Sequence, residues 1–166
     1  MYKRILLASD LSRESLVALR EGALIARAYE AKVFLLIVDP ETYGSRLGDS
    51  VHPRPLNGEP AALLELALSR LTRLGVSATG EAVIGEPTPL ISAAARRFQA
   101  DLVVVGHRRQ SLFDRWWSGS SGAYLADSVN CSLLIARDVV SDAELEARID
   151  GDAKDAAEAK KPPASG

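Results

Sequence analysis

The chain has 166 residues, 47% of them hydrophobic and 25% charged, which predicts a single soluble domain with one hydrophobic core. The formal net charge of −2 argues against nucleic acid or an anionic membrane as the main partner. One cysteine, Cys131, excludes an internal disulfide framework, and neither a signal peptide nor a run of about 18 apolar residues is found, so we expect a cytoplasmic protein.

Strand patterns recur along the chain, beginning with a short apolar run at residues 4–9. Further runs rich in Val, Ile and Leu follow at 32–38, 101–106 and 132–137. They are continuous rather than alternating, as in strands that are covered on both faces of a parallel sheet. A weaker and more polar run at 76–84 suits an edge strand.

Helical patterns lie between these strands, at residues 13–30, 60–74, 89–99 and 119–129. Ser12 and Thr88 are the expected N-caps of the first and third helices, Pro89 is expected at the first helical position, and Gly75 should end the second helix. The alternation of strand and helix predicts a three-layer α/β/α sandwich with right-handed crossovers.

Two segments interrupt this alternation. Residues 39–59 hold three Gly and three Pro with few apolar residues, which is typical of a long loop, either functional or disordered. Residues 141–166 hold seven acidic and four basic residues and almost no large apolar ones. We therefore expect a domain at 1–140 and a tail at 141–166 that is largely disordered from about Gly151.

Ligands of open parallel sheets bind beyond the carboxyl ends of the strands. Asp10 follows the first strand and either accepts a hydrogen bond from a ribose hydroxyl or a base amine, or caps a helix beside Ser12. The main-chain groups of Ile37 and Val38 end the second strand and can meet an adenine edge, while Asp39 before a proline favours a turn.

The loop after the fourth strand, "GHRRQSLFDRWWSGSSG" at 106–122, bunches Gly and Ser at an expected helix start. Backbone N–H groups can hold a phosphate there, and ordinary turn chemistry is the alternative. Trp116 and Trp117 favour core or subunit-interface packing over base stacking. His52 and His107 are isolated in sequence, so no metal site is predicted.

Known enzyme motifs are missing from the sequence. It contains no phosphate-binding G-x-x-x-x-G-K-[ST] loop, no G-x-G-x-x-G after the first strand and no G-x-S-x-G after a strand. No residue stands out as a general base. Strong catalysis is therefore not predicted, and at most a slow ATPase is left open.

Three segments resemble the universal stress protein family in order and spacing: "YKRILLASDLS", "VIGEPTPLISAAARRFQADLVVVGHR" and "GSS…NCSLLIAR". The resemblance covers about residues 2–138. It implies a Rossmann-like, five-stranded parallel sheet of order 3-2-1-4-5, similar to the adenine nucleotide alpha hydrolases. It also implies a stress-response regulator or adaptor, and a homodimer formed through the last strand at 132–138.

The nucleotide-binding subclass of that family carries G-x-x-G, nine residues, then Gly followed by Ser or Thr. Gly106 matches the first glycine, and Gly119 with Ser120 matches the last pair. The middle glycine is replaced by Arg109, which either blocks the approach of the phosphates or contributes its guanidinium to them.

The resemblance implies ATP or AMP as ligand, with Mg²⁺ as a possible companion of ATP. By the same resemblance, Asp10 meets the adenosine, the main chain of Val38 contacts the adenine, and Gly119, Ser120 and Ser121 meet the phosphates.

Two alternatives stay open at this point. The first is a dimeric interaction module of the same family that binds no nucleotide, which Arg109 favours because the founding subclass lacks the glycine motif. The second is an adenylating or electron-transfer relative of the same topology, whose pyrophosphatase branch needs an S-G-G-x-D-S loop after the first strand. The sequence there is "ASDLS". The sequence identifies no protein partner.

Overall fold

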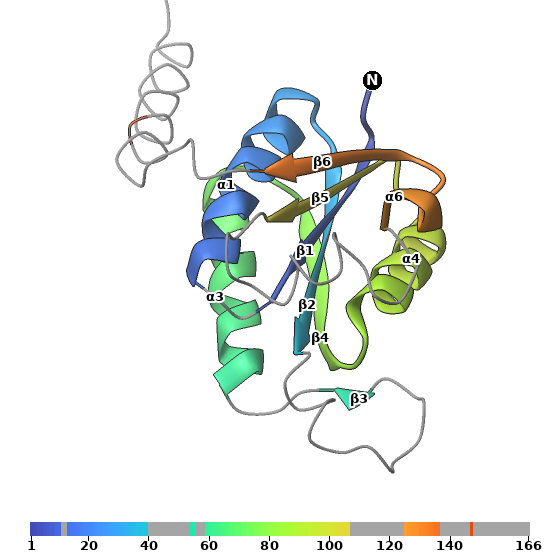
Figure 1. The fold of residues 1–166 in the computed structure, drawn as a ribbon. Helices are drawn as coiled ribbons and strands as arrows, with labels where there is room; N and C mark the ends of the chain where they lie inside the picture. The colour runs from blue at the N-terminus through green and yellow to red at the C-terminus, as the bar shows by residue number, and fades with distance from the viewer. Residues whose placement is uncertain (11–12, 40–53, 56–58, 107–124, 137–146, 148–166) are drawn as a thin grey trace, which may run out of the picture.

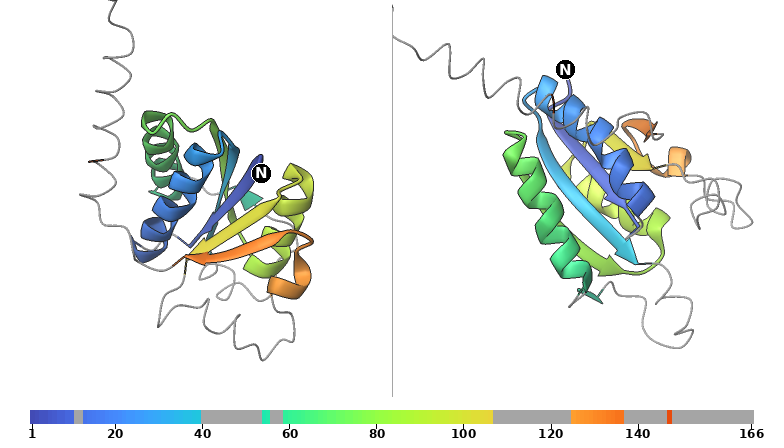
Figure 2. Two further views of the ribbon diagram at one scale, coloured as in Figure 1. Left: turned by 90° about the horizontal axis from the view of Figure 1, so that it is seen from above. Right: turned by 90° about the vertical axis from the view of Figure 1, so that its left-hand side faces the viewer.

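The computed structural model describes residues 1–10, 13–39, 54–55, 59–106, 125–136 and 147 of the chain. Its helices and strands are, in chain order, β1 (Arg4–Ser9), α1 (Arg13–Ala28), β2 (Lys32–Asp39), β3 (Arg54–Pro55), α3 (Glu59–Arg73), β4 (Ala78–Ile84), α4 (Pro87–Phe98), β5 (Leu102–Gly106), α6 (Leu125–Ser128) and β6 (Ser132–Ala136). The sheet lies between two helical layers, α1 with α3 on one face and α4 with α6 on the other (Figure 1, Figure 2).

The sheet has the strand order β3-β4-β2-β1-β5-β6. The five longer strands pair in parallel, so the predicted order of five parallel strands is confirmed. A sixth strand, β3, pairs antiparallel with β4 at Val83 and Ile84. It falls in the stretch 39–59, for which a loop alone was predicted, because two residues among Gly and Pro give no periodic signal. The prediction that residues 76–84 form an edge strand is therefore wrong at the carboxyl end of β4, where β3 pairs with it.

The side chains of alternate residues in each central strand pack into two hydrophobic cores, one on each face of the sheet. In β1, Ile5 and Leu7 pack toward α1 and α3, whereas Leu6 and Ala8 pack toward α4 and α6, and all four are 0% exposed. Successive side chains of a strand point to opposite faces, so a continuous apolar run is what a doubly covered strand requires. The continuous runs predicted this burial correctly for β1, β2 and β5, whereas β6, for which the same burial was predicted, is buried only at Ala136.

Three helices end at a residue in the left-handed conformation. Gly75 follows α3 with φ 74°, Glu30 follows α1 with φ 51°, and Gln99 caps α4 with φ 54°. In each case the next N–H bonds back to a carbonyl of the last turn, as in Ala31 to Ala26 at 2.8 Å. Gly75 was predicted as a stop. The first helix ends at Ala28 rather than 30, because Glu30 gives no such signal.

The start of α4 differs from the prediction. Glu86 is the N-cap and Pro87 the first helical residue, so Thr88 lies inside the first turn and is not the cap. Thr88 is buried, and its carbonyl accepts a hydrogen bond from Ser92 Oγ at 2.8 Å. Two prolines two residues apart both suit a helix start, and the earlier one takes it.

The amino ends of the strands are held together by Asp101. Its carboxylate accepts hydrogen bonds from the backbone N–H of Lys3 at 2.7 Å and of Arg4 at 3.1 Å. Its own N–H donates to the Arg4 carbonyl, and its carbonyl accepts from Ser132 N–H. This edge of β1, β5 and β6 is thus occupied by structural bonds, which leaves the carboxyl edge as the place to look for a ligand.

Candidate functional site

The candidate site lies where β1, β2 and β5 end. In the parallel register Ser9 is level with Ile37 of β2, and Ala8 is level with Val105 of β5. One residue further along, Asp10 comes beside Val38, and Gly106 comes beside Ser9. Neighbouring strands are about 4.8 Å apart, so three of the predicted ligand residues, Asp10, Val38 and Gly106, meet at one edge of the sheet.

This edge is also the point at which the chain connections diverge. The chain leaves β1 into α1 on one face, and α6, which follows β5 in the chain, packs on the other face. Adjacent strands whose connections leave to opposite faces open a crevice between them, where ligands of doubly wound folds bind. The fold therefore places Asp10 and Gly106 on the two strands that flank this crevice.

The three residues offer different chemical groups. Asp10 is half-buried and engaged in an interaction in the structure, and its carboxylate can accept hydrogen bonds from hydroxyl or amine donors. Val38 has a fully buried side chain, so only its main chain can serve a ligand. Gly106 ends β5 with no Cβ, which leaves room for close approach to the backbone.

A tight turn closes one side of this edge. The N–H of Gly85 donates to the carbonyl of Asp39 at 3.3 Å, which ties the β4–α4 turn to the end of β2. Gly85 has φ 155°, and a Cβ there would lie 2.8 Å from Leu90 Cδ1. Sequence reasoning missed this contact, although the "GEPTP" cluster is a turn and helix-start signal.

The remaining predicted residues lie outside the described part of the chain. They are Arg109, Gly119, Ser120 and Ser121, together with His52, His107, Trp116 and Trp117. Within the described residues, no group of three or more His, Cys, Asp or Glu side chains could hold a metal ion. No helix in this part of the chain is long and apolar enough to cross a membrane.

The cysteine lies at the opposite edge from the candidate site. Partial burial raises the pKa of the Cys131 thiol, the nearby Asp101 carboxylate raises it further, and a hydrogen bond with the Val103 backbone acts in the other direction. A thiol with a raised pKa stays protonated near neutral pH and is a poor nucleophile. Cys131 is therefore part of the packing beside β6 rather than of a reactive centre.

The strand order and the helices on both faces define a doubly wound α/β protein, with β1 and β5 as the strands at which the connections diverge. Comparison with known families then gives the class: the model of the universal stress protein family matches residues 1–137. The chain belongs to the universal stress protein family.

Relatives support this assignment over most of the chain. It is similar to the universal stress protein A homolog of Haemophilus ducreyi, with 32% identity over 143 residues covering 81% of this chain and 96% of the relative. It is also similar to universal stress protein A of Escherichia coli K12, with 32% identity covering 81% of this chain and 93% of that protein.

Solved structures share the fold. A universal stress protein crystallised in complex with cAMP aligns with TM-score 0.62 and 24% identity, covering 82% of this chain and 98% of its own. The universal stress protein of Archaeoglobus fulgidus in complex with dAMP aligns with TM-score 0.56 and 20% identity, with the same two coverages.

Proposed function

We propose that this universal stress protein binds an adenine nucleotide, ATP or AMP, at the carboxyl edge of its sheet. The proposal rests on one observation: the strand register brings Asp10, Val38 and Gly106 together at the carboxyl ends of β1, β2 and β5. Two relatives of the same fold were crystallised with cAMP and dAMP, which supports an adenine nucleotide as the class of ligand.

The roles follow from the groups that each residue offers. The Asp10 carboxylate accepts hydrogen bonds from a ribose hydroxyl or the adenine amine, and the Val38 main chain pairs with the adenine edge. The phosphates then extend toward Gly106 and the segment with Gly119, Ser120 and Ser121, where backbone N–H groups are the expected donors. A Mg²⁺ ion, if ATP brings one, would neutralise charge on those phosphates.

Ligand-induced stabilisation tests this proposal. A nucleotide at 100 times its dissociation constant stabilises the fold by about 2.7 kcal/mol, which raises the melting temperature of a domain this size by several degrees. Asp10→Asn should reduce that shift, because it removes the acceptor charge while keeping the side-chain size. Asp127→Asn, the same change on an exposed residue of α6, is the matched control and should leave the shift intact.

A separate variant tests the segment that is proposed to bind the phosphates. Gly119→Val places a branched side chain where the phosphates should approach and should abolish the shift. A folded Gly119→Val variant that still binds would refute the assignment of this segment. If millimolar ATP, ADP and AMP all leave the melting temperature of the unchanged protein unmoved, the nucleotide proposal itself is wrong.

A second candidate function rests on Arg109. An arginine in place of the second motif glycine favours a module that binds other proteins and no nucleotide. Arg109→Gly distinguishes the two: gain of a nucleotide-induced shift only in this variant supports the interaction module. A shift of equal size before and after the change supports nucleotide binding with Arg109 turned away from the phosphates.

We further propose that the protein acts as a homodimer and that its role is regulatory, as a stress-response adaptor without strong catalysis. β6 is at the end of the sheet order, and its apolar side chains lie on both faces, Leu133 and Ile135 toward α4 and Leu134 toward α1. All three are only half-buried in the single chain. An apolar edge strand of this kind is protected when a second copy pairs with it across a two-fold axis.

Light scattering at micromolar concentration tests the dimer. We expect the mass of two chains for the unchanged protein. Ile135→Pro removes a backbone donor from the strand and should yield monomer or aggregate, whereas a stable monomer before any change refutes the interface.

A further inference from the structure

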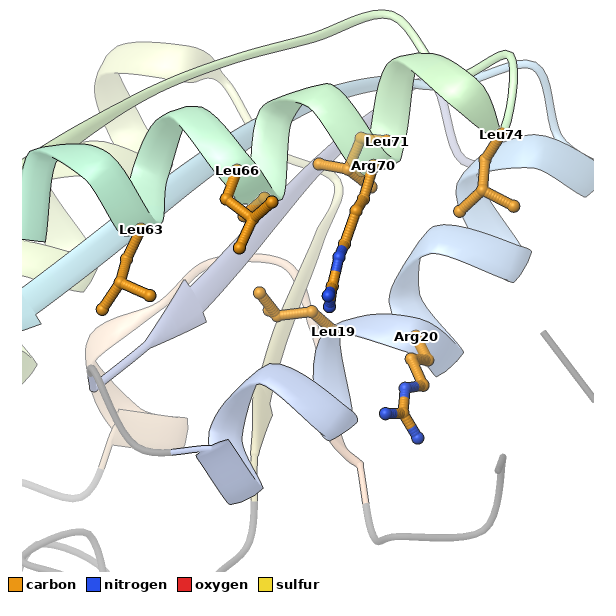
Figure 3. A pocket seen from close by; sticks show the side chains of 8 residues that line it. Leu19, Arg20, Leu63, Leu66, Arg70, Leu71 and Leu74 are labelled. Carbon is orange, nitrogen blue, oxygen red and sulfur yellow. The ribbon is translucent and has the colours of Figure 1, made fainter. Parts of the chain in front are cut away.

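A second surface feature lies away from the carboxyl edge, in a groove between α1 and α3 (Figure 3). Its empty volume is about 540 Å³, part of it open to solvent, and five leucines, one alanine and two arginines line it. Leu66 is 50% exposed there. Within the described part of the chain, only two other large hydrophobic side chains, Met1 and Tyr29, are exposed. The groove is therefore an apolar surface at which Leu66 is exposed.

Two arginines are among the groove residues that the structure describes. Arg70 extends from α3 toward Leu19 of α1, and Arg20 lies on α1 beside the same gap (Figure 3). None of the lining residues in the described part of the chain is acidic. An occupant that suits this groove presents apolar side chains to the leucines and a carboxylate to the Arg70 guanidinium.

We propose that residues 142–150 of the same chain occupy this groove as an amphipathic helix. Between residues 138 and 152 the sequence has six acidic side chains and one basic one, Arg148. Leu145 and Ile149 are four residues apart, so they share one face of a helix. The acidic residues Asp142, Glu146 and Asp150 repeat with the same spacing and form a row next to that face.

The path of the chain allows this contact. β6 ends at Ala136, which is buried in the same core as α1, and β6 contacts α1 directly. Packed helices are about 8–10 Å apart, so the segment must cross about one helix width to reach the groove. Residues 137–141 can span roughly 16 Å when extended, which is enough.

Ala147 is the one residue of this segment that the structure describes, and it is helical and exposed. Two residues along a helix rotate the side chain by about 200°, so Ala147 lies opposite both Leu145 and Ile149. The proposed helix requires an exposed residue at this position. Ala143 shares that outer side, which provides a matched pair of positions for controls.

The test compares the leucine methyl NMR signals of the groove in the full chain and two double variants. Leu145→Asp with Ile149→Asp should shift the Leu63 and Leu66 signals to the positions that they have in a chain ending at Val140. Ala143→Asp with Ala147→Asp adds the same charge on the outer side and should leave these signals unchanged. Both variants alter only the tail, so the domain stays folded.

Charge reversal provides a second readout. Arg70→Glu should release the tail and shift the Leu66 signal, and Asp142→Lys with Glu146→Lys in that background should restore it. Identical Leu63 and Leu66 signals in the full and shortened chains would overturn the proposal. A dependence of these signals on protein concentration would also overturn it, because the tail of a second copy would then be the occupant.

Discussion

Three glycines outside the candidate site test the packing in the structure, because a Cβ would meet something different at each. At Gly80 in β4, an added Cβ would lie 2.4 Å from the backbone oxygen of Leu35, and 3.0 Å from Leu64 Cδ1 of α3. At Gly22 in α1, it would lie 2.4 Å from Leu7 Cδ2, the far end of a side chain. At Gly75 nothing lies within 4 Å, but φ is 74°.

The expected costs of replacing each glycine by alanine follow from these neighbours. Overpacking costs about 1–3 kcal/mol, and Gly80→Ala should reach the upper end because a backbone oxygen of the central sheet cannot turn aside. Gly22→Ala should cost about 1 kcal/mol less than Gly80→Ala. The reason is that alanine is about 1 kcal/mol more favourable than glycine inside a helix. Gly75→Ala should cost about 1–2 kcal/mol through its left-handed backbone alone.

Urea unfolding followed by circular dichroism measures these differences. Gly80→Ala should show the largest fall in the free energy of unfolding, with an unchanged dependence on urea concentration if the fold is retained. A Gly80→Ala variant as stable as the unchanged protein would refute the close packing of β2, β4 and α3.

Further predictions concern the core and the amino edge. Ile91→Ala, at a residue of α4 that is 1% exposed, should lower the free energy of unfolding by about 2–5 kcal/mol in the same urea assay. The raised pKa of Cys131 means that the folded chain holds this proton to higher pH than the unfolded chain. Its contribution to stability is therefore present below the usual pKa of 9.0 and is lost as pH rises beyond it, which urea unfolding between pH 8 and 10 should detect. Asp101→Asn should lower the pKa of Cys131 and speed its alkylation by iodoacetamide at pH 8, and an unchanged rate would contradict the proximity of the two groups.

The five parallel strands were predictable because the apolar pattern of each strand lies within one short segment of the sequence. A run such as "RILLAS" or "KVFLLIV" has apolar side chains for both faces, and only a doubly covered parallel strand buries both. Helix ends were less predictable. Gly75 signals its own left-handed conformation, whereas Glu30 and Gln99 adopt it although neither is a glycine, so their residue types gave no signal.

The candidate site was predicted residue by residue but not as an arrangement. Sequence position alone puts Asp10 after one apolar run and Val38 at the end of another, and the family resemblance gave them roles. Their meeting with Gly106 depends on the strand order and register, which are set by pairing between segments far apart in the chain. The contact between Gly85 and Asp39 depends on the same pairing and had no signal of its own.

Nucleotide binding at the crevice between β1 and β5 is the central claim, and backbone amide NMR of the full chain during titration with AMP and ATP tests it most directly. We predict that the amide signals of Asp10, Asp39 and Gly106 shift with added nucleotide, while those of Lys3 and Asp101 at the opposite edge of the sheet stay in place. Saturating nucleotide that moves none of the carboxyl-edge signals, or moves only signals elsewhere, would contradict the claim.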